Sequence, residues 1–344
     1  MRGFFQYIPP FAPDYSGAVG ALFQAGGLII LCDPGGCSGN VAGYDEPRFY
    51  GSDAAFYSGA IRELDTIFGR DDKLEQKILA AANLGSYAFL ALVGTPVVSV
   101  IGTDLEALAR RLEKATGIPA FGISTTGMAD YSVGERLALM AYGKRLLPEH
   151  RGAAGDRIGI FGATPLNAAG GDNLPALMRE RYGDRAVLFS EAEGPACLAR
   201  MEGIKEILCL SPSCVPVCRM IRDRLGIPYQ MDYPASSTLV QAARAVPAGA
   251  KRVLILHQQA VGNTLRSLLR EKLECEICVG TFFQRDSDRL EEGDLLFQGE
   301  DELVEQGRHF DVIVADPLYR RALEGAGAVW VDLPHRACSG ELYL

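Results

Sequence analysis

The segment LIILCDPGGCSGNVAGYDEPRFY, residues Leu28–Tyr50, decides the fold of this chain of 344 residues. Its first four residues are apolar and predict a short buried strand. The chain then turns at once through Asp33 and a glycine pair that ends at Gly36, and it delivers Cys37. In a parallel α/β sheet, ligands bind at the carboxyl ends of the strands, and glycine lets the backbone approach them closely. Thiolates from Cys37 and Cys32 would suit a soft metal or an iron–sulfur cluster; the alternative is a tight turn with two buried cysteines.

Short β-rich runs alternate with longer helical stretches along the chain, which is typical of parallel α/β units. A polar, glycine-rich stretch at Leu147–Gly155 and the stretch AVPAGA at Ala245–Ala250 separate three such segments. We therefore predict three α/β domains with mainly parallel sheets, at residues 1–150, 151–248 and 249–344. The predicted strands are Leu28–Leu31, Phe89–Val93, Val97–Val100, Ile158–Phe161, Val187–Phe189, Glu206–Leu210, Val253–Leu256, Cys275–Val279, Val312–Ala315 and Ala328–Val331, and one of the predicted helices is Ala54–Leu64.

Composition narrows the class of protein. The formal net charge of −9 argues against a nucleic-acid partner, because such binding requires a basic face. Nothing at the N-terminus resembles a signal peptide, and no apolar run reaches the roughly 18–20 residues of a membrane span. Nine cysteines, an odd number without regular spacing, indicate reduced thiols in a cytoplasm. No G-x-x-x-x-G-K-S/T phosphate-binding loop occurs, so any ATP hydrolysis must take place on another protein.

Three blocks of the sequence resemble nitrogenase component 1-type oxidoreductases. The turn from Cys32 to Cys37, with Arg48 at the end of the run that follows, resembles the HGPxGC turn of that family. Residues 63–74, with ELDTIFG followed by KL, resemble the family's E-x-D-x-V-F-G-G-x-x-K-L. Residues 101–105, IGTDL, resemble its I-G-D-D-I, and the three blocks stand in the family's order. The resemblance implies three Rossmann-like α/β domains.

The resemblance also implies a cluster site at the turn. Family members take cluster thiolates from three places, of which this chain keeps the one at Cys37. Cys32 or Asp33 would assist, and Gly36 would let the backbone approach the cluster. A homodimer, or a heterodimer with a homologous subunit, would bring two turns together around one [4Fe–4S] cluster. We therefore expect the turn to lie at a subunit interface.

Two further segments carry metal-ligand chemistry. Cys209 follows a predicted strand, and Cys214 stands near the start of the next helix, where the helix dipole lowers the pKa of a thiol. Both lie in a segment that resembles the one holding the family's metallocluster cysteine, and His335 resembles the family's histidine ligand. Arg336 could hold a carboxylate, and His335 could donate a proton. We expect these four residues to line one pocket between the domains; the alternative is that they pack strand–helix turns and cap a helix.

Two functions are compatible with these features. The first is a nitrogenase-like reductase subunit that takes electrons from an ATP-dependent iron–sulfur protein and reduces a bound tetrapyrrole or metallocofactor. The second is a cluster-free scaffold or carrier of the same fold that binds such a ligand, and the missing thiolates favour it. A periplasmic-type binding protein for sugars or metal chelates is a third class, and the absence of an export signal argues against it. Iron and sulfide analysis of anaerobically purified protein separates the first two functions.

Overall fold

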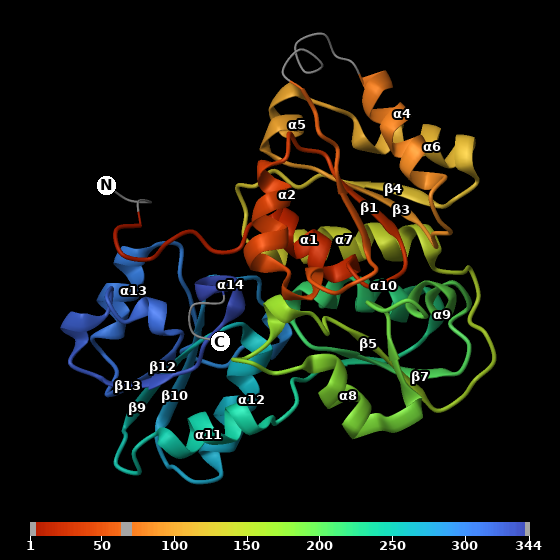
Figure 1. Cartoon of the computed structure of the whole chain (residues 1–344). Coiled ribbons are helices and arrows are strands. Elements are labelled where there is room, and N and C mark those ends of the chain that lie inside the picture. Colours follow the sequence, from red (N-terminus) through yellow and green to blue (C-terminus); the bar gives the residue numbers. More distant parts are fainter. Residues whose placement is uncertain (1–4, 63–70, 341–344) are drawn as a thin grey trace.

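The computed structural model describes residues 5–62 and 71–340 of the chain. In these ranges the strands form three separate sheets, and every pairing of neighbouring strands is parallel (Figure 1). The predicted α/β fold with mainly parallel sheets is therefore confirmed. The second block of family resemblance begins in residues 63–70, and this part of it lies outside the described residues. No helix in the described ranges is long and apolar enough to cross a bilayer.

The first sheet is built around the strand that opens the decisive segment. Its order is β2-β1-β3-β4, with β1 (Leu28–Leu31), β2 (Ala55–Ser58), β3 (Leu90–Val93) and β4 (Ala120–Ile123), and its helices are α1 (Asp14–Leu22), α4 (Asp71–Ala82), α6 (Leu105–Thr116) and α7 (Tyr131–Leu146). Successive side chains of a strand point to opposite faces of the sheet. Accordingly, Ile29 packs with residues of α1 and α7, whereas Ile30 packs with residues of α4 and α6. Both faces of β1 are buried, which explains its uninterrupted apolar run.

Two more sheets follow the same plan. The second has the order β6-β5-β7-β8, with β5 (Arg157–Phe161), β6 (Ala186–Leu188), β7 (Ile204–Cys209), β8 (Tyr229–Met231) and helices α8 (Leu174–Tyr182), α9 (Gly194–Arg200) and α10 (Val215–Leu225). The third has the order β11-β10-β9-β12-β13, with β9 (Arg252–Leu256), β10 (Glu276–Thr281), β11 (Leu295–Leu296), β12 (Val312–Ala315), β13 (Val329–Asp332) and helices α11 (Ser237–Ala245), α12 (Gln259–Arg270), α13 (Glu300–Gly307) and α14 (Arg336–Ser339). Helix α11 packs against α12 and β13 of the third sheet. The domain limits at residues 150 and 248 remain predictions.

Helices α1 and α7 cross with their backbones in contact. A Cβ atom on Gly17 of α1 would lie 1.9 Å from the carbonyl oxygen of Tyr131. A Cβ atom on Gly134 of α7 would lie 1.6 Å from the carbonyl oxygen of Asp14. Neither position can therefore carry a side chain at this spacing of the helices. Because α7 also packs against α10, this crossing helps to set the first sheet relative to the second.

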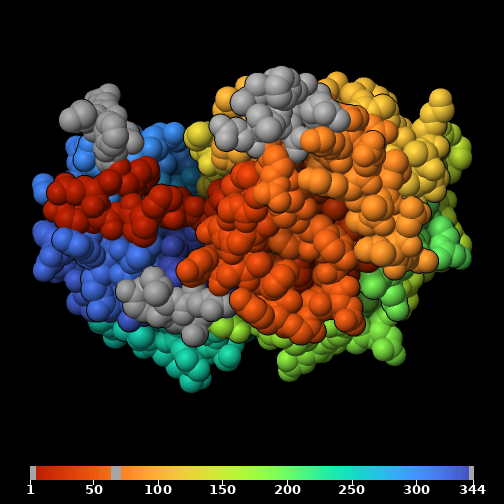
Figure 2. Space-filling view, turned by 45° about the horizontal axis from the view of Figure 1, so that its top comes forward, coloured from red at the N-terminus to blue at the C-terminus, as the bar shows by residue number. Residues whose placement is uncertain are grey.

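The C-terminal segment is held by backbone contacts from two distant parts of the chain. The N–H of Ala12 donates to the carbonyl of Ala337 at 2.8 Å, and the N–H of Gly170 donates to the carbonyl of Pro334 at 2.7 Å. Figure 2 shows the N-terminal segment, in red, lying across the blue C-terminal part of the chain. Residues near both ends of the chain therefore meet beside the third sheet.

Two local predictions are wrong. Residues 97–100, predicted as a strand, lie in helix α5 (Pro96–Ile101), which begins at a proline suited to the first helical turn. The β-branched valines there suggested a strand, but the proline at the start and Gly102, which ends the helix in the left-handed conformation, are helix signals. The predicted helix over residues 54–64 contains strand β2 instead, because β1 offers a free edge with which it pairs.

Candidate functional site

The turn after β1 is built around a buried carboxylate. Asp33 is fully buried and accepts hydrogen bonds from the N–H of Ser38 (2.8 Å) and from the hydroxyls of Ser38 (2.9 Å) and Ser58 (2.6 Å). These bonds tie helix α2 (Gly36–Asn40) and strand β2 to the end of β1. Cys32 is also fully buried, and burial raises the pKa of its thiol to about 12. In this arrangement both side chains support the turn from inside.

Cys37 lies in the first turn of α2 and is half-buried. Gly35 adopts φ 126°, and a Cβ atom on Gly35 or Gly36 would meet no atom within 4 Å. This side of the turn is therefore exposed. The thiol of Cys37 contacts the phenol of Tyr15, and burial raises the pKa of both groups. Of the four cysteines predicted as ligands, Cys37 is the one that is not fully buried.

A cleft of about 1460 Å³ lies between residues of the N-terminal and C-terminal parts of the chain. One wall contains a π-helix at Val41–Asp45, directly after α2. A π-helix is rare and often marks a functional site. The other walls come from the N-terminal segment 5–13, the loop 127–130 and the C-terminal residues 336–340.

Inside this cleft the N-terminal turn approaches the C-terminal segment. Tyr15, the partner of the half-buried thiol, lines the cleft. Asp45 also lines it and accepts hydrogen bonds from the hydroxyl of Ser16 (2.6 Å) and the amide of Asn40 (2.7 Å). Burial raises the pKa of Asp45, and the positive charge of Arg336 partly opposes this rise. Sequence reasoning missed Tyr15 and Asp45; the available signal for Asp45 was its place in the family-like run after the turn.

A second, smaller cleft of about 410 Å³ is also bordered by Arg336. Its walls come mostly from α8 and from loops and short helical turns next to the first and second sheets, and they include Arg48 and Arg179. The Arg48 guanidinium is held by the Glu46 carboxylate (2.6 Å), and Arg179 pairs with the carboxylate of Glu191. Among the predicted site residues, Arg336 alone borders these two clefts.

The two cysteines of the middle segment are closed off from both clefts. Cys209 ends β7, Cys214 precedes α10, and both are fully buried. A contact with the thiol of Cys218, together with burial, raises the pKa of Cys209, and burial raises the pKa of Cys214. The expected lowering of the Cys214 pKa by the helix dipole is therefore wrong, because desolvation of the thiolate outweighs it.

His335 is likewise enclosed. It precedes α14, is 1% exposed, and places Nε2 2.7 Å from the carbonyl oxygen of Leu166. Its Nδ1 lies 3.6 Å from the sulfur of Cys338. Burial lowers the pKa of His335 to about 4, so the ring is neutral at neutral pH. The expected pocket shared by Cys209, Cys214, His335 and Arg336 is thus replaced by a packed core, with Arg336 alone at a cleft.

The cluster that the family implies requires several metal-binding side chains close together. The described ranges contain no group of three or more His, Cys, Asp and Glu side chains placed to hold a metal ion. A [4Fe–4S] cluster takes four thiolate ligands. The described residues of one chain therefore do not fit a whole cluster, whereas Cys37 could supply one ligand to a cluster completed elsewhere.

Comparisons with known proteins agree with this architecture. The sequence profile of the family described as "Nitrogenase component 1 type Oxidoreductase" matches residues 13–236, which is more than half of the chain. The "Nitrogenase iron-molybdenum cofactor biosynthesis protein NifE" of Methanococcus maripaludis is 31% identical over 84 residues. This stretch is 24% of the present chain and 18% of that relative, so the chain aligns with less than a fifth of its length.

Solved structures show the same fold over nearly the whole chain. The structure "Nitrogenase Cp1 at pH 6.5" matches with a TM-score of 0.68 at 15% identity, covering 98% of this chain and 86% of that chain. The structure "Nitrogenase Cp1 at pH 5" matches with a TM-score of 0.69 at 16% identity, covering 100% and 86%. With the profile match over residues 13–236, the chain belongs to the nitrogenase component 1 type oxidoreductase family.

Proposed function

We propose that this chain is a scaffold or carrier subunit of a nitrogenase-like system, which binds a tetrapyrrole or a metallocofactor in the cleft of about 1460 Å³. The main support for this proposal is a combination of two observations. The described residues surround a large cleft, and among them no group of three or more His, Cys, Asp and Glu side chains is placed to hold a metal ion. Sites for drug-sized ligands measure about 300–1,000 Å³, so the cleft has room for a larger ring-shaped ligand.

The side chains of the cleft suit a conjugated, anionic ligand. Tyr7, Phe11 and Tyr44 line it and supply aromatic surface. The guanidinium of Arg321 lies over the ring of Tyr7, 5.1 Å from its centroid, and Arg336 borders the cleft from α14. Arginine pairs with carboxylates through two parallel hydrogen bonds. The carboxylates around a tetrapyrrole ring are suitable partners for these two arginines.

The relatives support a role in handling a cofactor. The matched Methanococcus maripaludis protein is named as an iron-molybdenum cofactor biosynthesis protein. Reduced thiols and a cytoplasmic location, expected from the cysteine content, are part of the same proposal.

The second candidate is a reductase subunit, and the exposure of the Cys37 turn favours it. In this alternative, a homodimer or a heterodimer would complete a shared [4Fe–4S] cluster around two such turns. An iron-protein-like ATPase would supply the electrons. The open space beside Gly35 and Gly36 leaves room for the second chain.

Metal analysis of protein kept anaerobic from lysis onward distinguishes the two candidates. A carrier of a tetrapyrrole is expected to contain little iron or sulfide and to show the sharp visible band of the bound ring, or to bind such a ring when it is added. A carrier of an iron-containing metallocofactor would contain iron, and this iron would remain in Cys37→Ser. One [4Fe–4S] cluster per dimer would instead give about two iron atoms per chain and a broad absorbance. If this iron is present and disappears in Cys37→Ser, the reductase replaces the carrier.

A further inference from the structure

We infer that the junction where the strand ends of the three sheets meet holds no metal or cluster in this protein, and that a hydrogen-bonded core centred on Glu135 links the sheets there instead. The family resemblance places a metallocofactor among these residues. In this protein, the potential ligands there are already bound to other protein groups.

Glu135 is the centre of this core. It projects from α7, is 1% exposed, and accepts hydrogen bonds from side chains of the second sheet's loops. Asn167 donates from its amide at 2.7 Å and Ser211 donates from its hydroxyl at 3.1 Å. Ser213 also donates to this carboxylate, and the hydroxyl of Thr164 lies 3.5 Å from it. Both carboxylate oxygens are therefore occupied by protein donors and not by a cation.

The third sheet closes the junction from the opposite side. The side-chain amide of Gln258, just before α12, donates to the carbonyl of Leu210 at 3.0 Å. The ring nitrogen Nε2 of His335 bonds to the carbonyl of Leu166 at 2.7 Å, and the hydroxyl of Tyr131 lies 3.4 Å from it. Elements of all three sheets thus share one hydrogen-bonded core.

Both ring nitrogens of His335 have protein neighbours, so neither is available to bind a metal ion. A carbonyl oxygen can only accept, so the bond to Leu166 places the proton on Nε2. The lone pair of the ring then lies on Nδ1, which faces the sulfur of Cys338 at 3.6 Å. The ring also stacks on His257, with centroids 4.1 Å apart, and meets Phe283 edge-on at 5.1 Å. A metal ion has no access to this lone pair without displacing Cys338.

The thiols at the junction are also engaged. Cys214 lies 3.3 Å from the hydroxyl of Ser211, and a Cβ atom on Gly162 would come within 2.8 Å of its sulfur. Protein atoms therefore pack directly against this thiol on these two sides. For two polar atoms of the junction, Oδ1 of Asn167 and Nε2 of His257, the described part of the chain supplies no hydrogen-bond partner within the distance and angle limits of a hydrogen bond. An amide oxygen and one imidazole do not make the four-coordinate nitrogen and sulfur shell that zinc requires, nor the thiolates of a cluster.

The test measures metal bound by variants of the full chain. Wild type, Cys214→Ser, His335→Gln and Cys37→Ser are reconstituted anaerobically with ferrous iron and sulfide and, separately, with zinc. Iron and zinc per chain are expected to be the same in Cys214→Ser and His335→Gln as in the wild type. A fall of half or more in either variant, with an unchanged circular dichroism spectrum, overturns the inference. Loss in Cys37→Ser alone would contradict the carrier function while leaving this inference intact.

A second experiment tests the linking role of Glu135. Glu135→Leu removes the acceptor from Asn167, Ser211 and Ser213, so the melting temperature is expected to fall by several degrees and trypsin is expected to cut the intact chain faster. Ser213→Ala, which removes one donor, is expected to show a smaller change in the same direction and serves if Glu135→Leu does not fold. The matched control is Glu75→Leu, which removes a partly exposed pairing with Arg111. If Ser213→Ala and Glu135→Leu both behave like this control, Glu135 does not link the sheets.

Discussion

The imidazole of His335 stacks on that of His257, with ring centroids 4.1 Å apart and ring planes inclined by 28°. Both rings are buried, at 1% and 2% exposure. Burial lowers the pKa of His335 to about 4, partly offset by the bond to the carbonyl of Leu166. Burial, and then the proximity of His335, lowers the pKa of His257 well below its usual value. Two neutral rings therefore pack where a protonated pair would be unstable.

This pair predicts a loss of stability in acid. Because the folded pKa of His335 lies below the unfolded value of 6.5, the unfolded chain binds the proton first. The stabilisation is complete above pH 6.5 and declines as the pH falls towards about 4, by about 3 kcal/mol for His335 alone. Urea unfolding at a series of pH values should therefore show a shallower decline for His335→Gln than for the wild type. Equal slopes would show that the ring is not desolvated in the folded protein.

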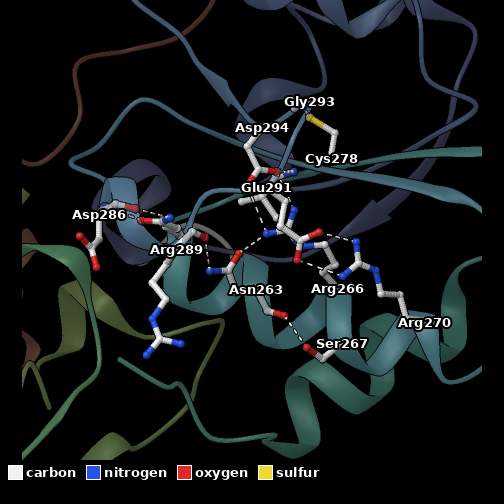
Figure 3. Close-up of polar contacts among 12 residues, drawn as sticks. Asn263, Arg266, Ser267, Arg270, Cys278, Asp286, Arg289, Glu291, Gly293 and Asp294 are labelled. Atoms are coloured by element: carbon white, nitrogen blue, oxygen red, sulfur yellow. Dashed lines mark hydrogen bonds and ion pairs between the residues drawn. The ribbon is translucent and has the colours of Figure 1, made fainter. Parts of the chain in front are cut away.

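A buried ion pair anchors the loop between β10 and β11 to helix α12 (Figure 3). Arg266 and Asp294 each have side chains that are 2% exposed and lie 2.6 Å apart. Asp294 also accepts the N–H groups of Val279 (2.9 Å) and Glu291 (3.0 Å). Removing one partner of a buried pair leaves an uncompensated charge and costs about 3–5 kcal/mol.

Arg266→Met is therefore expected to lower the free energy of unfolding in urea by this amount. Adding Asp294→Asn, which removes the charge but keeps an acceptor for the two N–H groups, should restore part of the loss. Arg270→Met, one turn along the same helix, breaks an exposed pairing with Glu291 and should cost less than about 1 kcal/mol. A cost for Arg266→Met no larger than that for Arg270→Met would contradict the prediction.

The crossing of α1 and α7 predicts a severe effect of a single methyl group. In Gly134→Ala the new Cβ atom would overlap the carbonyl of Asp14, and a backbone atom cannot move aside as a flexible side chain can. We expect a loss of at least about 3 kcal/mol, or no soluble protein. Gly39→Ala in α2 has open space around it and should change stability by less than about 1 kcal/mol. Thermal melting of the two variants side by side checks the expectation, and equal melting temperatures would rule out the close crossing.

The large cleft predicts a selective role for Arg336 in ligand binding. Coproporphyrin, titrated into the protein and followed by its fluorescence, should bind to the wild type. Arg336→Gln is expected to weaken binding by about tenfold to a hundredfold, because a charge-assisted hydrogen bond to a carboxylate is lost. Arg179→Gln is the matched control, since Arg179 borders the smaller cleft and not the larger one. Equal weakening in both variants would move the site to the smaller cleft, and no weakening in either would exclude both arginines.

Much of the fold could be predicted from the pattern of apolar and polar residues along short segments of the sequence. The apolar run of β1, and those of β9 and β12, predict strands buried on both faces, and the helices between them predict parallel pairing. These features depend on neighbouring residues, so sequence order reveals them. The helix at residues 96–101 was harder to predict, because its valines suit a strand. The local signals for a helix there are the proline that opens it and Gly102, which follows it in the left-handed conformation.

The candidate site was far less predictable. Cys214 and His335 are residue types that can bind a metal. In the folded chain, however, the Cys214 thiol contacts the hydroxyl of Ser211, and Nε2 of His335 is hydrogen-bonded to the carbonyl of Leu166. The role of Glu135 could not be predicted from the sequence. It lies on a helix 78 residues before Ser213, which donates a hydrogen bond to it. No local spacing connects two such positions.

The sequence by itself determined the fold class and the family, since alternating apolar runs and the turn motif around Cys37 are short-range patterns. Only the tertiary structure decided which side chains face a ligand. It buried Cys209, Cys214 and His335 in a hydrogen-bonded core and left Arg336 at two clefts. The physical reason is that access and protonation of a side chain depend on what long-range packing places beside it. Burial, for example, is the main cause of the pKa shifts of Cys214 and His335.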